Sequence, residues 1–147
     1  MMPAAQIYKK LSGVILEKSI SVASSSPAGS DGNAYAVRTG AFATSSLINV
    51  NVVSVNRDLN NTVPLQISGL TGYNLTESKI LTASGQTAET ILENNISADS
   101  TGKFSLPPSS VLILKYIRNS VHIVETVYLR CWQALLQDFY GAALHPD

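Results

Sequence analysis

Apolar and polar side chains alternate along residues 47–56 (LINVNVVSVN), and this period of two predicts a β-strand. Isoleucine and valine occupy one face of that strand, while Asn49 and Asn51 occupy the other. Val53 and Val55 then break the alternation. Either both faces of the strand are covered at this point, or a β-bulge shifts its register by one residue.

The same pattern recurs in shorter segments that are separated by glycine, proline or asparagine. Residues 63–68 alternate cleanly, and Pro64, which has no N–H, is expected at a sheet edge. The expected strands are residues 14–22, 33–39, 47–56, 63–68, 73–81, 104–106 and 111–117. About seven or eight short strands at this spacing predict an all-β fold, an antiparallel β-sandwich.

Two other segments show the helical period instead. Residues 3–11 carry an apolar stripe on one helical face, and Gly13 follows as a stop signal. The stripe consists of Ala4, Ile7, Tyr8 and Leu11. Ser120–Leu144 carries a longer stripe and predicts a C-terminal helical tail.

Two connections have polar sequences that indicate tight turns. Asn56–Asn61 is expected to form a hairpin between the strands that flank it. Thr87–Glu93 is expected to form one helical turn. The chain then divides into a helix over residues 1–12, a sandwich over residues 13–118 and a tail over residues 119–147.

The charge balance excludes several classes of partner. The 147 residues include 10 Lys and Arg and 10 Asp and Glu, so no basic surface indicates nucleic acid or an anionic membrane. No apolar run approaches the ~20 residues of a membrane span. No apolar leader follows the first lysines, so we expect no signal peptide on this chain. A single cysteine, Cys131, excludes an internal disulfide and a cysteine-rich metal site.

Three sequons make Asn60, Asn74 and Asn95 candidate N-glycosylation sites. Glycosylation requires entry into the secretory pathway, for which this chain lacks a leader. From this conflict we expect that a part preceding Met1 is missing.

The sequence offers no catalytic constellation. The two histidines, His122 and His145, lie in the tail, and a nucleophilic serine or cysteine needs a nearby base. Glu89 and Glu93 could share a helical face, yet nothing apolar surrounds them to raise either pKa. Asp31-Gly32-Asn33 is typical of a turn. We therefore expect no catalytic residue, no metal site and no cofactor.

Sugar binding by a sandwich would use exposed aromatic rings as flat platforms. The aromatic residues of the expected sandwich are scattered, so core and interface packing explains them better. They are Tyr35, Phe42, Tyr73, Phe104 and Tyr116.

Three stretches together resemble the C-terminal β-sandwich of clan-A glycoside hydrolases. The α-L-arabinofuranosidases are the nearest family, with β-xylosidases and β-glucosylceramidases close behind. Residues 4–13 (AAQIYKKLSG) resemble the last helix of the (β/α)8 barrel that precedes the sandwich. Residues 47–58 (LINVNVVSVNRD) resemble a sandwich strand, and residues 106–111 (LPPSSV) resemble the closing strand. The resemblance covers roughly residues 3–116 and implies that residues 1–12 are the remnant of a barrel helix.

In those enzymes the barrel carries the catalytic glutamates, and no position of this chain corresponds to them. The resemblance thus implies a non-catalytic accessory sandwich of a secreted, extracellular enzyme that acts on plant-type or other polysaccharides. Its partner would be the missing barrel of the same polypeptide, packed against Ala4, Ile7, Tyr8 and Leu11.

Two alternatives stay open. One is a free-standing, immunoglobulin-like module for adhesion, interaction or carbohydrate binding, and the other is a small active hydrolase. Residues 120–147 match nothing in these enzymes, so the tail of residues 119–147 is either native or a gene-model artefact.

Overall fold

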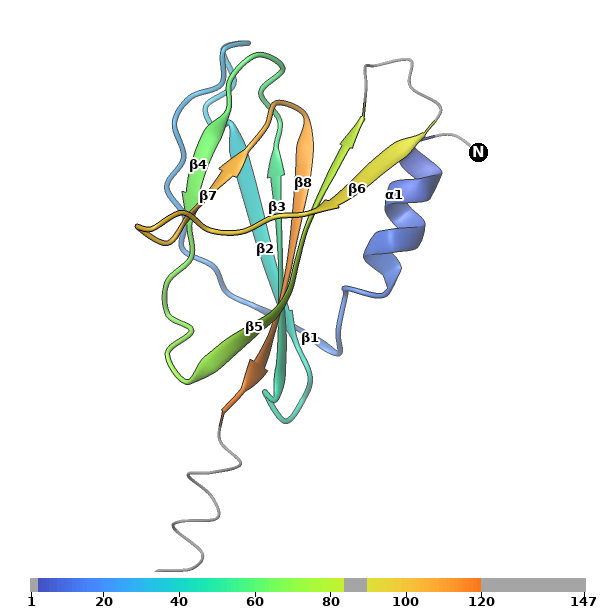
Figure 1. The fold of residues 1–147 in the computed structure, drawn as a ribbon, viewed down its shortest axis with the longest axis vertical. Coiled ribbons are helices and arrows are strands. Elements are labelled where there is room, and N and C mark those ends of the chain that lie inside the picture. Colours follow the sequence, from blue (N-terminus) through green and yellow to red (C-terminus); the bar gives the residue numbers. More distant parts are fainter. Residues whose placement is uncertain (1–2, 84–89, 120–147) are drawn as a thin grey trace, which may run out of the picture.

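The computed structural model describes residues 3–83 and 90–119, which contain one helix and eight strands (Figure 1). Helix α1 is Pro3–Ser12. The strands are β1 (Lys18–Ile20), β2 (Val37–Ala43), β3 (Asn49–Asn56), β4 (Val63–Gln66), β5 (Tyr73–Ala83), β6 (Ile91–Asn95), β7 (Lys103–Leu106) and β8 (Ser110–Arg118). Six strands form one antiparallel sheet in the order β1-β2-β3-β8-β5-β6, and β4 pairs with β7 in a second sheet. The prediction of an antiparallel sandwich is confirmed.

The core lies between the two sheets. The register pairs Val52 of β3 with Leu114 of β8, so their side chains point to the same face. There they meet Val63 of β4 and Phe104 and Leu106 of β7, all of them buried. Apolar residues at every second position therefore join the sheets, as the alternation predicts.

The broken alternation in β3 comes from a covered outer face. The β3–β8 pairing runs from Asn49 to Asn56 without a shift, so no bulge is present there. Val53 and Val55 instead pack into an apolar cluster on the outer face of the sheet. The buried members of this outer cluster are Val14, Leu81, Val111 and Ile113. The bulge of this sheet lies in β5, between Leu75 and Glu77.

The predicted hairpin at Asn56–Asn61 is wrong. Strands β3 and β4 belong to different sheets, so the connection crosses from one layer of the sandwich to the other. Asn56 and Asp58 are 0% and 1% exposed, because their side chains turn inward and form hydrogen bonds with the backbone of Asn61 in the crossing segment. Polar residues that suit a solvated turn equally suit a buried crossover.

Three further boundaries differ from the prediction. The segment expected as a helical turn is extended from Ile91 onward, where β6 pairs with β5; residues 87–89 lie outside the described ranges. Of residues 14–22 only Lys18–Ile20 pair as a strand. The strand expected at 33–39 runs as Val37–Ala43 instead, straight through Gly40. Pairing with neighbouring strands, rather than the local pattern of apolar and polar residues, determines where these strands begin and end.

The N-terminal helix is confirmed as α1. In the described ranges no helix is long and apolar enough to cross a membrane. The predicted tail lies outside the described residues, together with Glu89, His122, Cys131 and His145.

Candidate functional site

The apolar stripe of α1 is divided between the sheet and solvent. Leu11 packs against the outer cluster, and Ile7 is half-buried. Tyr8, in contrast, is 75% exposed, and Ile15, just beyond the helix, is 57% exposed. Ala4 lies in the first turn of the same helix. The surface that the sequence predicts to pack on a barrel therefore has one flank on this chain's own sheet and one open flank.

Polar contacts fasten α1 to the neighbouring edge strand β6 (Figure 1). The Gln6 side-chain oxygen accepts a hydrogen bond of 3.2 Å from the N–H of Ile91. One turn further on, Lys10 pairs with Glu93 of β6. Both contacts lie on the side of α1 that faces the sheet, so they hold α1 against β6.

The Lys10–Glu93 pair is the first step of an ion network across the sheet, which we call the charge ladder. Lys79 Nζ lies 2.9 Å from Glu93 and 2.8 Å from Glu77. Lys115 Nζ lies 2.9 Å from the other oxygen of Glu77. The ladder thus links α1, β6, β5 and β8.

The charge ladder brings two carboxylates to one lysine, but it cannot serve as a glycosidase pair. Lys10 and Lys79 lower the pKa of Glu93 to about 2. Lys79 and Lys115 likewise lower the pKa of Glu77. A glycosidase needs one carboxyl that stays protonated near neutral pH. Both of these remain ionised, so their role is structural.

Acid is expected to loosen α1 from the sheet. The pKa of Glu93 is about 2 in the folded chain against an ordinary 4.5. A depressed pKa contributes stability that is complete above the ordinary value and is lost as the pH falls toward 2. The thermal midpoint of the wild type should therefore exceed that of Glu93→Gln at pH 6, and the difference should vanish near pH 2.

Lys9→Gln supplies the matched control, because Lys9 lies in the same helix turn and makes no ion pair with another described residue. A pH-independent difference between the wild type and Glu93→Gln would contradict the assigned role of the charge ladder.

A buried polar hub holds the crossover between the sheets. Asn56 Nδ2 donates to the carbonyl oxygens of Asn61 at 2.9 Å, Leu106 at 3.0 Å and Pro107 at 3.0 Å. Its Oδ1 accepts a hydrogen bond of 3.0 Å from the N–H of Asp58. One side chain thus joins the end of β3, the start of β4 and the end of β7.

Asp58 extends this hub to the long loop before β2. Its carboxylate accepts hydrogen bonds from the N–H of Ser30 at 2.7 Å and from the N–H of Asn60 at 2.8 Å. Hydrogen bonds from Ser30, Asn60 and Asn61 hold the pKa of Asp58 far below its ordinary value. A buried anion that is satisfied entirely by N–H and O–H donors is a structural tie.

The three sequons differ in their surroundings, although all three asparagines are exposed. Asn60 Nδ2 donates to Ser30 Oγ at 3.1 Å, within the polar hub. Asn74 Oδ1 accepts a hydrogen bond of 3.1 Å from Asn119. Asn95 ends strand β6. Within residues 3–83 and 90–119, no cluster of His, Cys, Asp and Glu could hold a metal ion.

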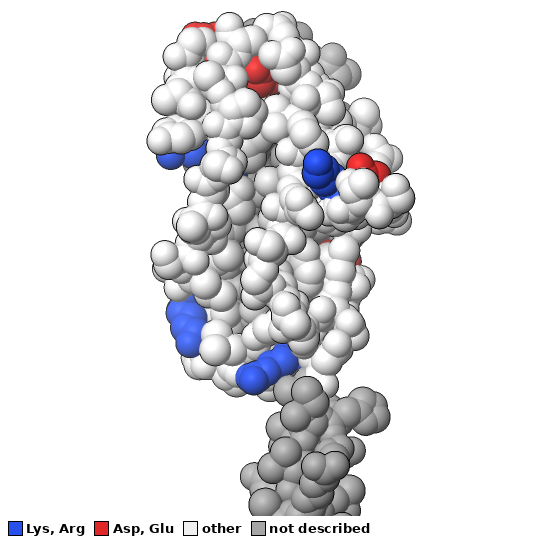
Figure 2. Space-filling model, turned by 90° about the vertical axis from the view of Figure 1, so that its left-hand side faces the viewer, with Lys and Arg blue, Asp and Glu red and all other residues white. Residues whose placement is uncertain are grey.

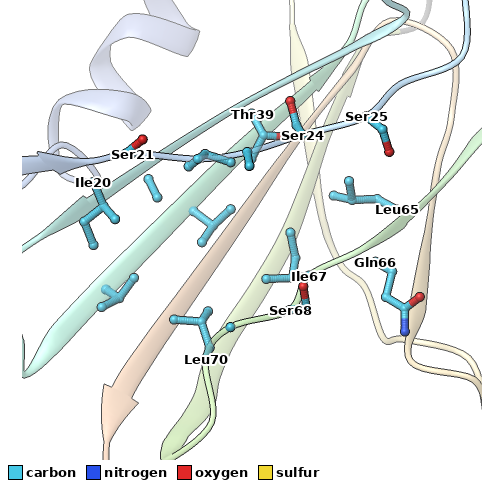
Figure 3. A pocket seen from close by; sticks show the side chains of 16 residues that line it. Ile20, Ser21, Ser24, Ser25, Thr39, Leu65, Gln66, Ile67, Ser68 and Leu70 are labelled. Atoms are coloured by element: carbon cyan, nitrogen blue, oxygen red, sulfur yellow. The ribbon is translucent and has the colours of Figure 1, made fainter.

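A trough opens on one side of the sandwich, with a volume of about 530 Å³ (Figure 3). Ala41, Val50 and Val52, from the inner faces of β2 and β3, lie along its floor. Residues 20–25 form one rim and residues 65–70 form the other. This size lies within the ~300–1,000 Å³ of ordinary ligand pockets.

Solved structures share this fold. A family 51 α-L-arabinofuranosidase, AbfB from Bifidobacterium longum, aligns with 67% of this chain and 22% of its own, with 20% identity and a TM-score of 0.53. A second arabinofuranosidase aligns with 71% of this chain and 26% of its own, with 15% identity and a TM-score of 0.51. The fold of this chain is that of a domain found in glycoside hydrolases.

The chain spans about a quarter of the length of these enzymes. At such low identity the likeness establishes the fold and no more. No protein-family model matches the chain, and no curated protein matches its sequence.

Sequence reasoning missed the trough and the polar hub. The trough is lined by connecting segments that run beside the sheets. In the sequence, the serines of these segments are typical of an ordinary polar loop. The hub had a weak signal in Asn56 and Asp58, two polar residues that directly follow an apolar strand. Such a pair is equally typical of a solvated turn.

Proposed function

We propose that this chain is a C-terminal accessory sandwich of a glycoside hydrolase that acts on polysaccharides, and that it supports a (β/α)8 barrel of the same polypeptide. The observation that carries the proposal is the shared fold with about a quarter of two arabinofuranosidases. The sequence resemblance of residues 4–13 to a barrel helix supports it, because these residues form α1.

The physical role follows from the position of α1. The charge ladder and Leu11 fix one side of the helix to the sheet. Tyr8 and Ile15 remain exposed and would be buried by a neighbouring domain. The helix would then act as a shared element, since it packs on the sandwich with one flank and on the barrel with the other.

In this proposal, residues 1–12 are the barrel remnant, residues 13–118 are the sandwich and residues 119–147 are a separate tail. The parent is a secreted protein, and its exposed sequons at Asn60, Asn74 and Asn95 are used in the secretory pathway. The catalytic acid and nucleophile reside in the barrel. No described carboxylate of this chain takes either role.

The test compares one substitution in two settings. The gene upstream of Met1 should continue as an open frame that encodes the barrel. In that longer parent, Tyr8→Gln should lower the free energy of unfolding by about 2 kcal/mol, because a buried aromatic anchor is lost. In the isolated chain the same substitution should change little, because Tyr8 is 75% exposed there.

Tyr35→Gln is the matched control, since Tyr35 is an exposed tyrosine far along the chain from α1, with an exposed fraction of 46%. It should behave alike in the parent and in the isolated chain. A signal peptide joined directly to Met1 would overturn the proposal in favour of a free-standing module. Turnover of an aryl arabinofuranoside by the isolated chain would overturn it in favour of a small hydrolase.

A further inference from the structure

Apolar side chains are exposed at the end of the sandwich where the described chain stops. Leu47 and Ile48 precede β3 and are 37% and 47% exposed, and Leu75 of β5 is 42% exposed. Tyr73 and Tyr116 lie beside them and are partly buried against the core. In Figure 1, this end is the bottom of the long sheet, below β4 and β7. We call these five residues the end patch.

The backbone brings the end patch together around the last residues of β8. The N–H of Arg118 donates a hydrogen bond of 2.8 Å to the carbonyl oxygen of Ile48. On the other side of β8, Leu75 is opposite Tyr116 in the register. Since neighbouring strands lie ~4.8 Å apart, the patch is about 10 Å wide. The chain leaves β8 beside the patch and continues into residues 120–147.

The segment that follows the end patch has an apolar stripe that could cover it. Residues 120–147 lie outside the described ranges, and their sequence carries the longer of the two helical stripes. An isolated helix with one apolar face is marginal until that face packs on something. Val124 comes five residues after Asn119, and five extended residues span at most about 18 Å, so the patch is within reach. The stripe consists of Val124, Tyr128, Cys131, Trp132, Leu135 and Phe139.

The distribution of charge also favours the tail as the occupant. Residues 120–147 contain three of the ten acidic residues and one of the ten basic residues. Their net charge is therefore −2, and that of residues 1–119 is +2. Arg118 is exposed beside the patch, and in Figure 2 the charged atoms near the lower end of this side are all basic. Opposite charges attract the tail, whereas a second copy of the patch would bring like charges together.

We propose that residues 124–139 form a helix whose apolar stripe packs on the end patch and closes this end of the sandwich. The helix covers Ile48 and Leu75, which are the most exposed members of the patch. Because the tail is tethered beside the patch, its effective concentration there is high, and a weak contact suffices. This inference does not depend on the proposed function, because it concerns only contacts within this chain.

The test uses the full chain and its single tryptophan, Trp132, which belongs to the stripe. We expect acrylamide to quench Trp132 fluorescence less in the folded chain than in the urea-unfolded chain, because the indole ring is buried on the patch. The double substitution Ile48→Ser and Leu75→Ser should shift the tail about tenfold toward the undocked state and raise the quenching, because two apolar contacts are lost. Both side chains are exposed in the sandwich, so the variant should still fold, which circular dichroism verifies.

Ile117→Ser is the matched control. Ile117 is 42% exposed at the same end of the sheet, but it follows the core-facing Tyr116 and therefore points to the opposite face. This substitution should leave the quenching of Trp132 unchanged. Quenching as strong in the folded wild type as in urea, or equal quenching in the wild type and the double variant, would overturn the proposal. Protection of Trp132 that appears only as the chain concentration rises would overturn it in favour of contact between two copies.

Discussion

Leu114→Ala is expected to lower the free energy of unfolding by about 3–5 kcal/mol, a large fraction of the stability of a domain of this size. Leu114 is 0% exposed at the centre of β8. That strand lies between β3 and β5, where Leu114 pairs with Val52 and Ser78. The core around it is joined to both sheets, so the cavity cannot collapse without moving strands.

Ile117→Ala is the control on the same strand, because Ile117 is 42% exposed and lies outside the core cluster. It should cost less than about 1 kcal/mol. Urea unfolding followed by circular dichroism measures both variants. Similar midpoints for the two would show that β8 is not the central strand of the core, which would contradict the fold described above.

The central strands β3 and β8 could be predicted because one requirement, the burial of apolar side chains on both faces, determines their sequences. Strand β3 must bury valines against β4 and β7 on one face and against the outer cluster on the other. Strand β8 meets the same requirement, since Val111, Leu112, Ile113 and Leu114 are all buried. A run of apolar residues on both faces is therefore a property of the sandwich centre, and it is visible without coordinates.

The periphery could not be predicted in the same way. Strand β6 has an exposed and mostly polar sequence, and it exists because β5 offers an edge and Lys10 and Lys79 bind Glu93. The short β1 is likewise set by its partner β2. Contacts between residues that are far apart in sequence determine where β6 and β1 form. The local pattern of apolar and polar residues does not reveal such contacts.

Of the candidate sites, too, one could be predicted from the sequence and one could not. The exposed flank of α1 could be predicted from the sequence. Four apolar residues on a short helix form a stripe that is wider than a single packing partner covers. The trough could not, because it arises where two connecting segments fail to pair. An absent hydrogen bond leaves no signature in composition or period, whereas an amphipathic face does.

Asn56→Asp is expected to lower the free energy of unfolding by about 3 kcal/mol at pH 7. The two side chains have the same shape, so packing is preserved while the hydrogen bonding and the charge change. The Asn56 amide donates to three carbonyl oxygens in a fully buried position. A carboxylate there donates nothing and faces three acceptors, which is an unpaired buried charge.

The pH dependence separates this explanation from a general loss of packing. Carbonyl oxygens and burial both disfavour the ionised form, so the introduced carboxyl should have a raised pKa in the folded state. A raised pKa on an acid makes the loss small at pH 4, where the protonated form restores one donor, and larger as the pH rises. Asn94→Asp, on exposed β6, should cost little at either pH. Since the Asn56 amide joins β3, β4 and β7, a loss that is equal at pH 4 and pH 7 would mean that shape, and not hydrogen bonding, holds the two sheets together at this crossover.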